Sequence, residues 1–225
     1  MEISLIMNQN SYVGREYLEA LKKEDIKVDV LSIGLHPERD LIEEERCGKL
    51  WSPKDQVSLA KYHYFYNFPH LKSKQLNRFL IMKKYDLGIQ GGTDIIKENI
   101  IDKYKLGILN FHPGLLPQYR GCSAPEWQIY ENKNVYSTCH IIDKGIDTGK
   151  IVAKKQLNTN YKSYYHFRAS IYKEISIFLV NTIKNIIENK GFVNKPYNQE
   201  EKIAVYRKYI GKKKIDYIKK NYFNE

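Results

Sequence analysis

Apolar and polar positions repeat with two different periods along the first part of the chain, and these periods predict strands and helices in turn. Residues 2–7 form an apolar run of strand-favouring residues, and residues 26–33 alternate like a second strand. Between them, residues 12–23 carry apolar side chains at helical spacing. The chain is therefore predicted to open with a β-α-β unit.

A second series of elements follows residues 34–70, which show no sustained period and are predicted to be irregular. The segment from Ser123 to Glu126 is predicted to begin a helix, with Ser123 as its N-cap and Glu126 closing a capping box. Strands that alternate with helices imply an α/β fold with a doubly wound, mostly parallel, Rossmann-like sheet. The remaining pattern predicts helices over 71–84, 95–101 and 163–190 and strands over 85–90, 106–111, 137–142 and 149–155.

The 225 residues, 42% of them hydrophobic, suit one well-packed domain with a tail. We expect residues 1–194 to form the main domain and residues 195–225 to be a basic C-terminal extension, too short for a core of its own. No apolar run approaches the roughly 20 residues that span a bilayer, and no basic region precedes the apolar N-terminus. We therefore expect a cytoplasmic protein with no membrane partner. The three cysteines stand in no paired spacing, which predicts neither disulfides nor a zinc site.

The net charge of +11 is concentrated in the last third of the chain. Residues 151–225 contain 16 Lys and Arg against 6 Asp and Glu, whereas residues 1–150 contain 21 against 20. A basic tract of this kind attracts nucleic acid, an acidic membrane surface or a phosphorylated small molecule. A lysine-rich solvated surface is an equally good interpretation, so charge alone does not predict a nucleic-acid partner.

One loop carries the residues that point most strongly to chemistry, in the twelve-residue run NFHPGLLPQYRG that begins at Asn110. His112 stands two residues further on, and so on the same side of a strand end, and the later turn GIDTG contributes Asp147. A carboxamide, an imidazole and a carboxylate together can stabilise an oxyanion and manage a proton during acyl transfer to an amine. Arg120, in the same run, offers a planar fork for an anion.

Each of these side chains also has a purely structural interpretation. Asn110 could satisfy backbone groups at a strand end, His112 could be a structural residue ahead of a proline, and Asp147 could stabilise a turn. Their combination with a loop rich in glycine and proline favours the catalytic interpretation. The other five histidines show no metal-ligand spacing and are expected to be structural or exposed: His36, His63, His70, His140 and His166.

The stretch from residue 85 to residue 151, which contains both motifs, resembles the 10-formyltetrahydrofolate-dependent formyltransferase family. The resemblance implies that Asn110 and His112 stabilise a tetrahedral intermediate and that Asp147 aids proton transfer. It also implies N10-formyltetrahydrofolate as the formyl donor, without a metal. Asp94 departs from the arginine found at its place in some members. The two loops that would hold the pterin comprise Gly92, Thr93, Asp94, Ile95 and Ile96 in one and Lys144, Gly145, Ile146 and Asp147 in the other.

The family contains branches with different amine acceptors. Glycinamide ribonucleotide formyltransferases resemble one another in a glycine-rich phosphate loop after the first strand, where this chain has only Gly14. Methionyl-tRNA formyltransferases are similar in the tail, around Ile215, Asp216 and Tyr217, but they carry a further tRNA-binding domain for which we expect no room here.

The resemblance therefore favours the third branch, the sugar-nucleotide N-formyltransferases, whose acceptor is an amino sugar on a nucleoside diphosphate. The alternatives are an enzyme like the glycinamide ribonucleotide or methionyl-tRNA formyltransferases, a formyltetrahydrofolate hydrolase, and a nucleic-acid-binding protein without catalytic activity. The aromatic segment 62–68 and the tail offer surfaces for a homodimer, although core packing is the slightly better interpretation of residues 62–68. The candidate substrate contacts are Arg120, Arg207 and Lys208 for the pyrophosphate and Tyr206, Tyr209 and Trp127 for the base, although Trp127 could also be a core residue.

Overall fold

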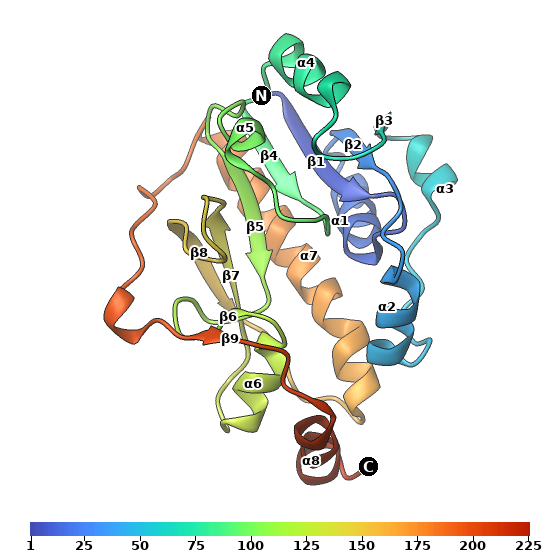
Figure 1. Cartoon of the computed structure of the whole chain (residues 1–225), viewed down its shortest axis with the longest axis vertical. Coiled ribbons are helices and arrows are strands. Elements are labelled where there is room, and N and C mark those ends of the chain that lie inside the picture. The colour runs from blue at the N-terminus through green and yellow to red at the C-terminus, as the bar shows by residue number, and fades with distance from the viewer.

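The computed structural model describes the backbone of residues 1–225 and every side chain except that of Arg39. Figure 1 shows how the elements are arranged. In chain order they are β1 (Ile3–Asn8), α1 (Tyr12–Lys23), β2 (Asp29–Ile33), α2 (Arg39–Cys47), α3 (Gln56–Ala60), β3 (Tyr64–Phe68), α4 (Lys74–Lys83), β4 (Leu87–Gln90), α5 (Glu98–Ile101), β5 (Ile108–His112), β6 (Arg120–Gly121), α6 (Ala124–Tyr130), β7 (Tyr136–Ile141), β8 (Ile151–Gln156), α7 (Tyr164–Glu188), the 3-10 helix η1 (Glu201–Ile203), β9 (Tyr206–Arg207) and α8 (Lys212–Tyr222).

Seven strands form one sheet in the order β3-β2-β1-β4-β5-β7-β8. The first five strands in this order run parallel, whereas β7 and β8 are antiparallel to their neighbours. The direction of winding reverses between β1 and β4, and ligands of doubly wound sheets bind where the carboxyl ends of strands meet at such a reversal. The predicted α/β fold with a mostly parallel, Rossmann-like sheet is confirmed, and β5 ends beside this crevice.

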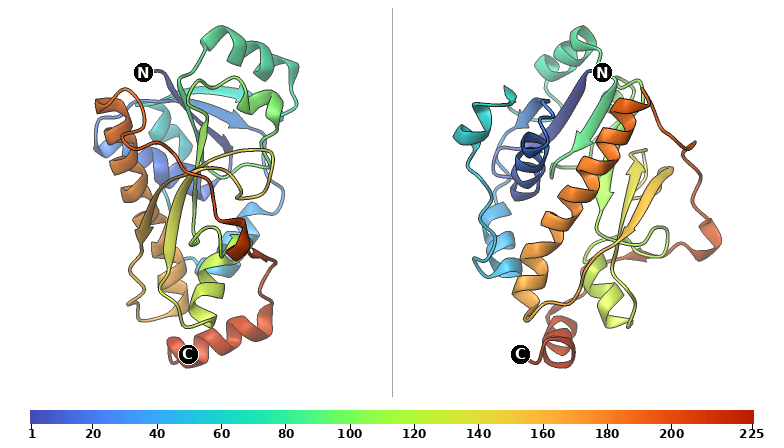
Figure 2. Two further views of the ribbon diagram at one scale, coloured as in Figure 1. Left: turned by 90° about the vertical axis from the view of Figure 1, so that its left-hand side faces the viewer. Right: turned by 180° about the vertical axis from the view of Figure 1, so that it is seen from behind.

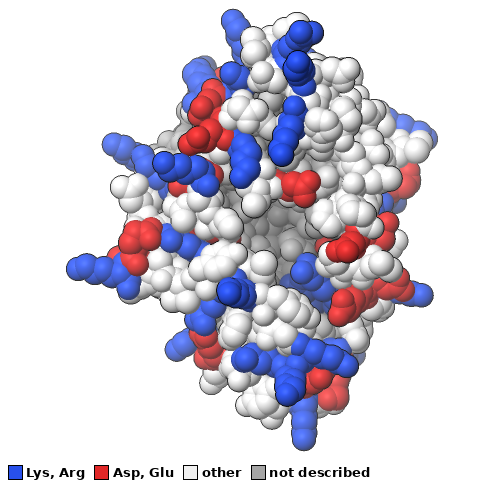
Figure 3. Space-filling view, viewed as in Figure 1, with Lys and Arg blue, Asp and Glu red and all other residues white. Residues whose placement is uncertain are grey.

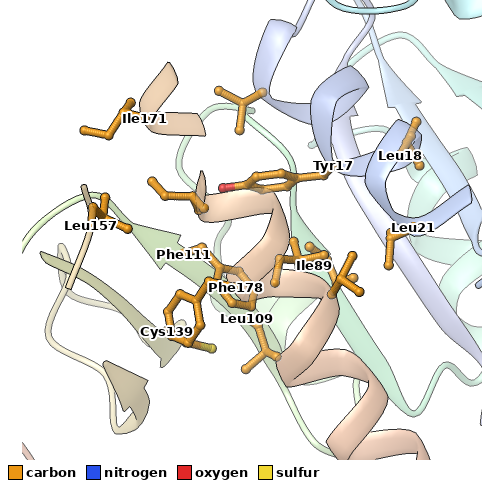
Figure 4. Packing of buried hydrophobic residues seen from close by; sticks show 14 of the residues in the cluster. Tyr17, Leu18, Leu21, Ile89, Leu109, Phe111, Cys139, Leu157, Ile171 and Phe178 are labelled. Atoms are coloured by element: carbon orange, nitrogen blue, oxygen red, sulfur yellow. The ribbon is translucent and has the colours of Figure 1, made fainter. Parts of the chain in front are cut away.

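Helices cover both faces of the sheet because successive side chains of a strand point to opposite faces. Leu5 and Met7 of β1 join the core under α1 and α7, whereas Ile6 between them joins the core under α4 and α5. Seen from behind, α7 runs along the length of the sheet (Figure 2). In the core beneath it, Phe111 of β5 packs edge-on against Phe178 of α7, with ring centroids 5.4 Å apart (Figure 4). This packing anchors β5 just before the loop that carries the candidate chemistry.

The prediction that residues 34–70 are irregular is wrong, because they form α2, α3 and β3. Most residues of α2 are charged, so its sequence shows no clear apolar stripe. The helix is supported by its contact with α7. β3 is the edge strand of the sheet, and its run of aromatic residues hides the alternation that marks a strand. Two of those aromatics, Tyr66 and Phe68, pack on Phe79 of α4 with centroids 4.6 and 5.3 Å away.

The last residues of the chain form a small two-stranded sheet with β6 and pack on helices of the main domain. β9 pairs with β6, and α8 contacts α6. Ile218 of α8 is fully buried, and Phe223 stacks on Phe167 of α7 with ring centroids 5.8 Å apart. The C-terminus consequently lies beside the beginning of α7 (Figure 1).

Candidate active site

The structure brings Asn110, His112 and Asp147 into contact at the end of β5. Asn110 pairs in register with His140 of β7, which draws the connection between β7 and β8 over the end of β5. That connection carries Asp147, whose Oδ2 lies 3.4 Å from Nδ1 of His112. Asn110 donates from Nδ2 to Oδ1 of the same carboxylate over 3.4 Å. One carboxylate thus touches both side chains of the strand.

The hydrogen bonds of His112 fix which ring nitrogen carries the proton. Nε2 lies 2.6 Å from the carbonyl oxygen of Tyr119, and a carbonyl can only accept, so Nε2 donates. Burial lowers the pKa of His112, while the charge of Asp147 acts in the opposite direction. The neutral ring therefore presents an unprotonated Nδ1 beside Asp147. Gly114 permits this geometry, because a Cβ there would lie 2.7 Å from Nε2.

Asp147 is held in a conformation that few residues other than glycine adopt, with φ of +55°. The backbone N–H of Gly121 donates to its Oδ2 over 2.8 Å. Burial would raise the pKa of Asp147, whereas the hydrogen bond from the Gly121 N–H lowers it, and the pKa lies well below the usual range. Asp147 is therefore ionised at neutral pH.

His140 belongs to the site, although sequence patterns gave it only a structural or exposed position. It is buried, and its Nδ1 lies 3.3 Å from the carbonyl of Ile141, to which it donates. Its Nε2 then accepts from Nδ2 of Asn110 over 3.1 Å and lies 3.5 Å from Asp147. His140 therefore orients the Asn110 amide. The signal that could have identified it is the strand pairing, not a spacing in the sequence.

A cavity of about 120 Å³ opens beside these residues. Ile95 and Ile96 form one wall and Gly145 and Ile146 another, with Asn110, His140 and Asp147 among the other lining residues. Five of the nine residues predicted to hold a pterin, Asp147 among them, thus line the cavity. Ile95 and Ile146 are exposed apolar side chains, 59% and 46% accessible, which leaves an apolar edge for a flat ring.

The other residues predicted to hold a pterin, Gly92, Thr93, Asp94 and Lys144, do not line this cavity. Gly92 has a φ of +78° and its carbonyl accepts from the N–H of Asn8. Asp94 and Lys144 are exposed. The Oγ1 of Thr93 is buried and has no hydrogen-bond partner in the part of the chain that the structure describes.

The guanidinium of Arg120 is occupied within the protein, which argues against the predicted binding of a substrate anion. Arg120 is only 7% exposed. It donates from Nε and Nη2 to Oε1 of Gln199 over 3.1 and 2.9 Å, and it forms an ion pair with Glu201 over 2.6 Å. Its function in this arrangement is to tie the C-terminal segment to the loop.

Arg207 and Trp127 are likewise engaged inside the protein. Arg207 pairs with Glu131 through Nη1 over 2.8 Å and through Nη2 over 3.1 Å. Its guanidinium also lies over the rings of Tyr119 and Trp127, 5.2 and 5.1 Å from their centroids. Trp127 donates from Nε1 to the carbonyl of Lys208 over 2.8 Å. These contacts favour a structural position for Trp127 and Arg207.

Three predicted substrate contacts are free to reach solvent: Lys208, Tyr206 and Tyr209. Tyr209 lines a second cavity of about 430 Å³ between α2, α8 and the beginnings of α6 and α7. Arg46, Lys212 and Lys219 also line it, and basic side chains gather over α8 on this face of the molecule (Figure 3).

The predicted capping box at the start of α6 is wrong. Ser123 lies in the left-handed region with φ of +52°, and its side chain makes no cap hydrogen bond. Its Oγ instead accepts from the N–H of Ile210 over 3.4 Å. Glu126 is drawn inward, where it pairs with Arg168 over 3.2 Å and accepts from Tyr164. Tertiary partners have therefore replaced the local cap.

No described helix combines the length and apolar character that a membrane crossing requires. Among the same residues, no group of three or more His, Cys, Asp or Glu side chains is arranged to hold a metal ion.

In comparison with known proteins, this chain is similar to three kinds of enzyme. A methionyl-tRNA formyltransferase of Clostridium perfringens is 29% identical over 127 residues, which cover 55% of this chain and 40% of that protein. Glycinamide ribonucleotide transformylase 1 from Symbiobacterium toebii has a similar fold, with a TM-score of 0.62 at 16% identity over 88% of this chain and 93% of that one.

The third is the N-formyltransferase from Helicobacter canadensis, in complex with folinic acid and dTDP-3-aminofucose. It matches with a TM-score of 0.60 at 20% identity over 92% of this chain and 71% of that one. At such identities the two structural likenesses concern the fold. The sequence model of the formyl transferase family matches residues 1–163, which include Asn110, His112 and Asp147. This protein therefore belongs to the formyl transferase family.

Proposed function

We propose that this protein transfers a formyl group from N10-formyltetrahydrofolate to the amine of a nucleotide-linked amino sugar. The observation that carries the proposal is the contact of Asp147 with both Asn110 and His112, beside an apolar-walled cavity that Asn110 and Asp147 line. Membership of the formyl transferase family supports the reaction type. The choice of acceptor rests on the surroundings of the site.

The three side chains can divide the reaction between them. Nδ1 of neutral His112 accepts a proton as the acceptor amine attacks the formyl carbon and the electron pair of the carbonyl moves to oxygen. Asn110 donates a hydrogen bond to that oxyanion, because its 3.4 Å contact with Asp147 is long and easily exchanged. The carboxylate of Asp147 stabilises the charged ring of His112. The ring then returns the proton to N10 as the bond between N10 and the formyl carbon breaks.

The donor cavity fits the pterin end of a folate. Its volume of about 120 Å³ is below the roughly 300–1,000 Å³ of common small-molecule sites, so it suits one ring system and not a whole folate. The apolar side chains of Ile95, Ile96 and Ile146 can cover the faces of that ring. The rest of the folate would extend into solvent from the same edge.

The larger cavity is well placed for the nucleotide of the acceptor. Ser123 lines it and stands two residues after Gly121, whose N–H holds Asp147, so the cavity begins within about 8 Å of that contact along the chain. Lys212, Lys219 and Arg46 can approach a pyrophosphate, although Glu45 and Asp216 at the same cavity reduce its net positive charge.

The floor of this cavity also offers a partner for a base. Oε2 of Glu126 is buried and has no hydrogen-bond partner among the residues that the structure describes, although Glu126 lines the cavity. An N–H group on the edge of a nucleobase would satisfy it. The rings of Tyr165 and Tyr209 supply aromatic surface for the same base.

The loop after β1 offers no phosphate cradle of the kind that a ribonucleotide acceptor would need. The first glycine after β1 is Gly14, which lies inside α1 and not in the loop. A Cβ at Gly14 would stand 2.6 Å from the carbonyl oxygen of Gly91. Gly14 therefore permits close packing of α1 on the turn after β4. This observation favours the amino-sugar acceptor over glycinamide ribonucleotide.

The test is a formyl-transfer assay with amino-sugar derivatives of dTDP, UDP and GDP, glycinamide ribonucleotide and methionyl-tRNA as acceptors. We expect turnover with one amino-sugar nucleotide, and about a 100- to 1,000-fold loss in Asn110→Ala and His112→Ala. The exposed His166→Ala is the matched control and should keep full activity.

Other outcomes would replace the proposal. Transfer only to methionyl-tRNA or to glycinamide ribonucleotide would change the acceptor. Release of formate without any amine would indicate a hydrolase. Salt-sensitive retention on RNA that depends on Lys212–Lys214 and not on His112 would indicate a nucleic-acid-binding protein.

A further inference from the structure

A segment near the C-terminus crosses the candidate site. It contacts both the turn that carries Asp147 and strand β6. We call residues 199–207, from Gln199 through η1 and β9, the C-terminal strap. It passes beside β6, as the views in Figures 1 and 2 agree. The region that matches the formyl transferase family ends at residue 163, so the strap lies outside that match.

The side chain of Gln199 joins the strap to the loop that carries Asp147. Its Nε2 donates to the carbonyl oxygens of Asp147 and Gly149, both over 2.8 Å. Its Oε1 accepts from Nε and Nη2 of Arg120. A reversed amide would set oxygen against two carbonyls and NH₂ against a guanidinium, so the orientation is fixed by its partners. Gln199 is 9% exposed, and both of its N–H groups are used on this one turn.

That turn needs support from outside itself. Asp147 has a φ of +55°, a conformation that costs energy for a residue other than glycine and persists only where its surroundings enforce it. Lys144, Gly145 and Ile146 before it are exposed. The hydrogen bonds from Gln199 fall on either side of Thr148 and therefore secure the backbone where the carboxylate emerges.

The strap also places the donor that faces the carboxylate. β9 pairs with β6, with Tyr206 opposite Arg120 and Arg207 opposite Gly121. The N–H groups of Arg120 and Cys122 donate to carbonyls of the strap over 3.0 and 2.9 Å. Between these two bonds, the N–H of Gly121 donates to Oδ2 of Asp147. The strap therefore holds the backbone of Asp147 directly, through Gln199, and its carboxylate indirectly, through the Gly121 N–H.

We propose that Gln199 is a positioning residue, which holds the carboxylate of Asp147 against His112 through the two backbone carbonyls that it binds. This inference rests on the proposed function, since it assigns to Asp147 a part in formyl transfer. Arg120, predicted from sequence to bind a substrate anion, instead orients Gln199. The strap is then a component of the active site.

Two substitutions separate this role from general stability. Gln199→Glu keeps the side-chain length and the pairing with Arg120 but loses both N–H donors, whereas Gln199→Ala loses all four hydrogen bonds. We expect kcat to fall about 10- to 100-fold in both, because small displacements of a catalytic group have effects of that size, while KM for the folate changes little. Gln156→Glu, at an exposed position on β8, is the matched control and should retain wild-type kcat.

A second measurement does not depend on turnover. The pKa of His112, measured by NMR, should fall in Gln199→Ala, because a displaced Asp147 carboxylate no longer stabilises the charged ring. Unchanged kcat and an unchanged titration of His112 in both Gln199 variants would overturn the inference. If the wild-type protein forms no product with any acceptor, the proposed function fails, and the titration in Gln199→Ala still decides whether Gln199 positions Asp147.

Discussion

The backbone N–H of Gly121 donates to Oδ2 of Asp147 over 2.8 Å, and the strap passes over the same glycine. Gly121 has a φ of +92°, and a Cβ built on it would lie 2.3 Å from the carbonyl oxygen of Arg207. A single residue thus sets the distance between the loop, the strap and the carboxylate of Asp147. Both its positive φ and its close approach to the carbonyl oxygen of Arg207 require a residue without a side chain.

Gly121→Ala should therefore reduce both activity and stability. The methyl group must push the strap away from β6, and the N–H that holds Asp147 moves with it. We expect a kcat at least tenfold lower and a lower melting temperature, measured by steady-state kinetics and thermal unfolding. Gly191→Ala is the matched control, because no atom lies within 4 Å of a Cβ at that position. Equal behaviour of the two variants would show that the crossing at Gly121 is not tight.

The acid limb of the pH profile should reflect His112. The reactive ring is neutral, and burial lowers its pKa below the ordinary value of 6.5. The fraction of reactive enzyme is then above one half at pH 6.5 and is lost as the pH falls through the lowered pKa. We expect kcat/KM, measured between pH 5 and pH 8, to reach half of its plateau value below pH 6.5. A half-plateau value reached above pH 6.5 would mean that Asp147 outweighs burial and raises the pKa of His112.

The apolar edge of the donor cavity predicts a defect confined to folate binding. Ile146 is 46% exposed and lines the cavity, so Ile146→Ser removes apolar contact with a bound ring at little cost to the fold. Burial of an isoleucine side chain is worth about 1.5–3 kcal/mol, which corresponds to a Kd for the folate raised about tenfold or more. Isothermal titration with folinic acid measures this change. Ile177→Ser, at an exposed position of α7, should bind folate as the wild-type protein does.

The sheet could be predicted from sequence because its strands and helices carry their own periodicities. The pattern fails where an element depends on its neighbours. α2 is charged along most of its length and packs on α7, while β3 is an edge strand whose aromatics contact α4. Ser123 and Glu126 fit a capping box in sequence, yet the N–H of Ile210 and the side chain of Arg168 engage them instead. Partners that are distant in sequence decide such cases.

The candidate site likewise contains some residues that sequence patterns predict and others that they do not. Asn110 and His112 can be placed together from sequence because positions i and i+2 of a strand share a face. The GIDTG turn indicates Asp147 as the third residue. His140 and Gln199 could not be predicted, since one enters through the register of β7 and the other through a segment 52 residues after Asp147. The fork of donors on Arg120 predicts a bound substrate anion, but that fork binds Gln199 and Glu201.

The packing of Phe223 predicts that the C-terminal residues unfold together with the main sheet. Phe223 is buried against Phe167 and Tyr164, with ring centroids 5.8 and 6.2 Å away. Phe223→Ala leaves a cavity between α7 and the C-terminus, and such a change costs about 3 kcal/mol of unfolding free energy. Urea unfolding followed by circular dichroism should show one transition at lower urea, since loss of the tail's anchor weakens the core of α7. Tyr222→Ala, at a more exposed neighbouring position, should shift the midpoint far less. A variant that loses only the tail signal, with the main transition unmoved, would mean that residues 195–225 fold as a separate unit.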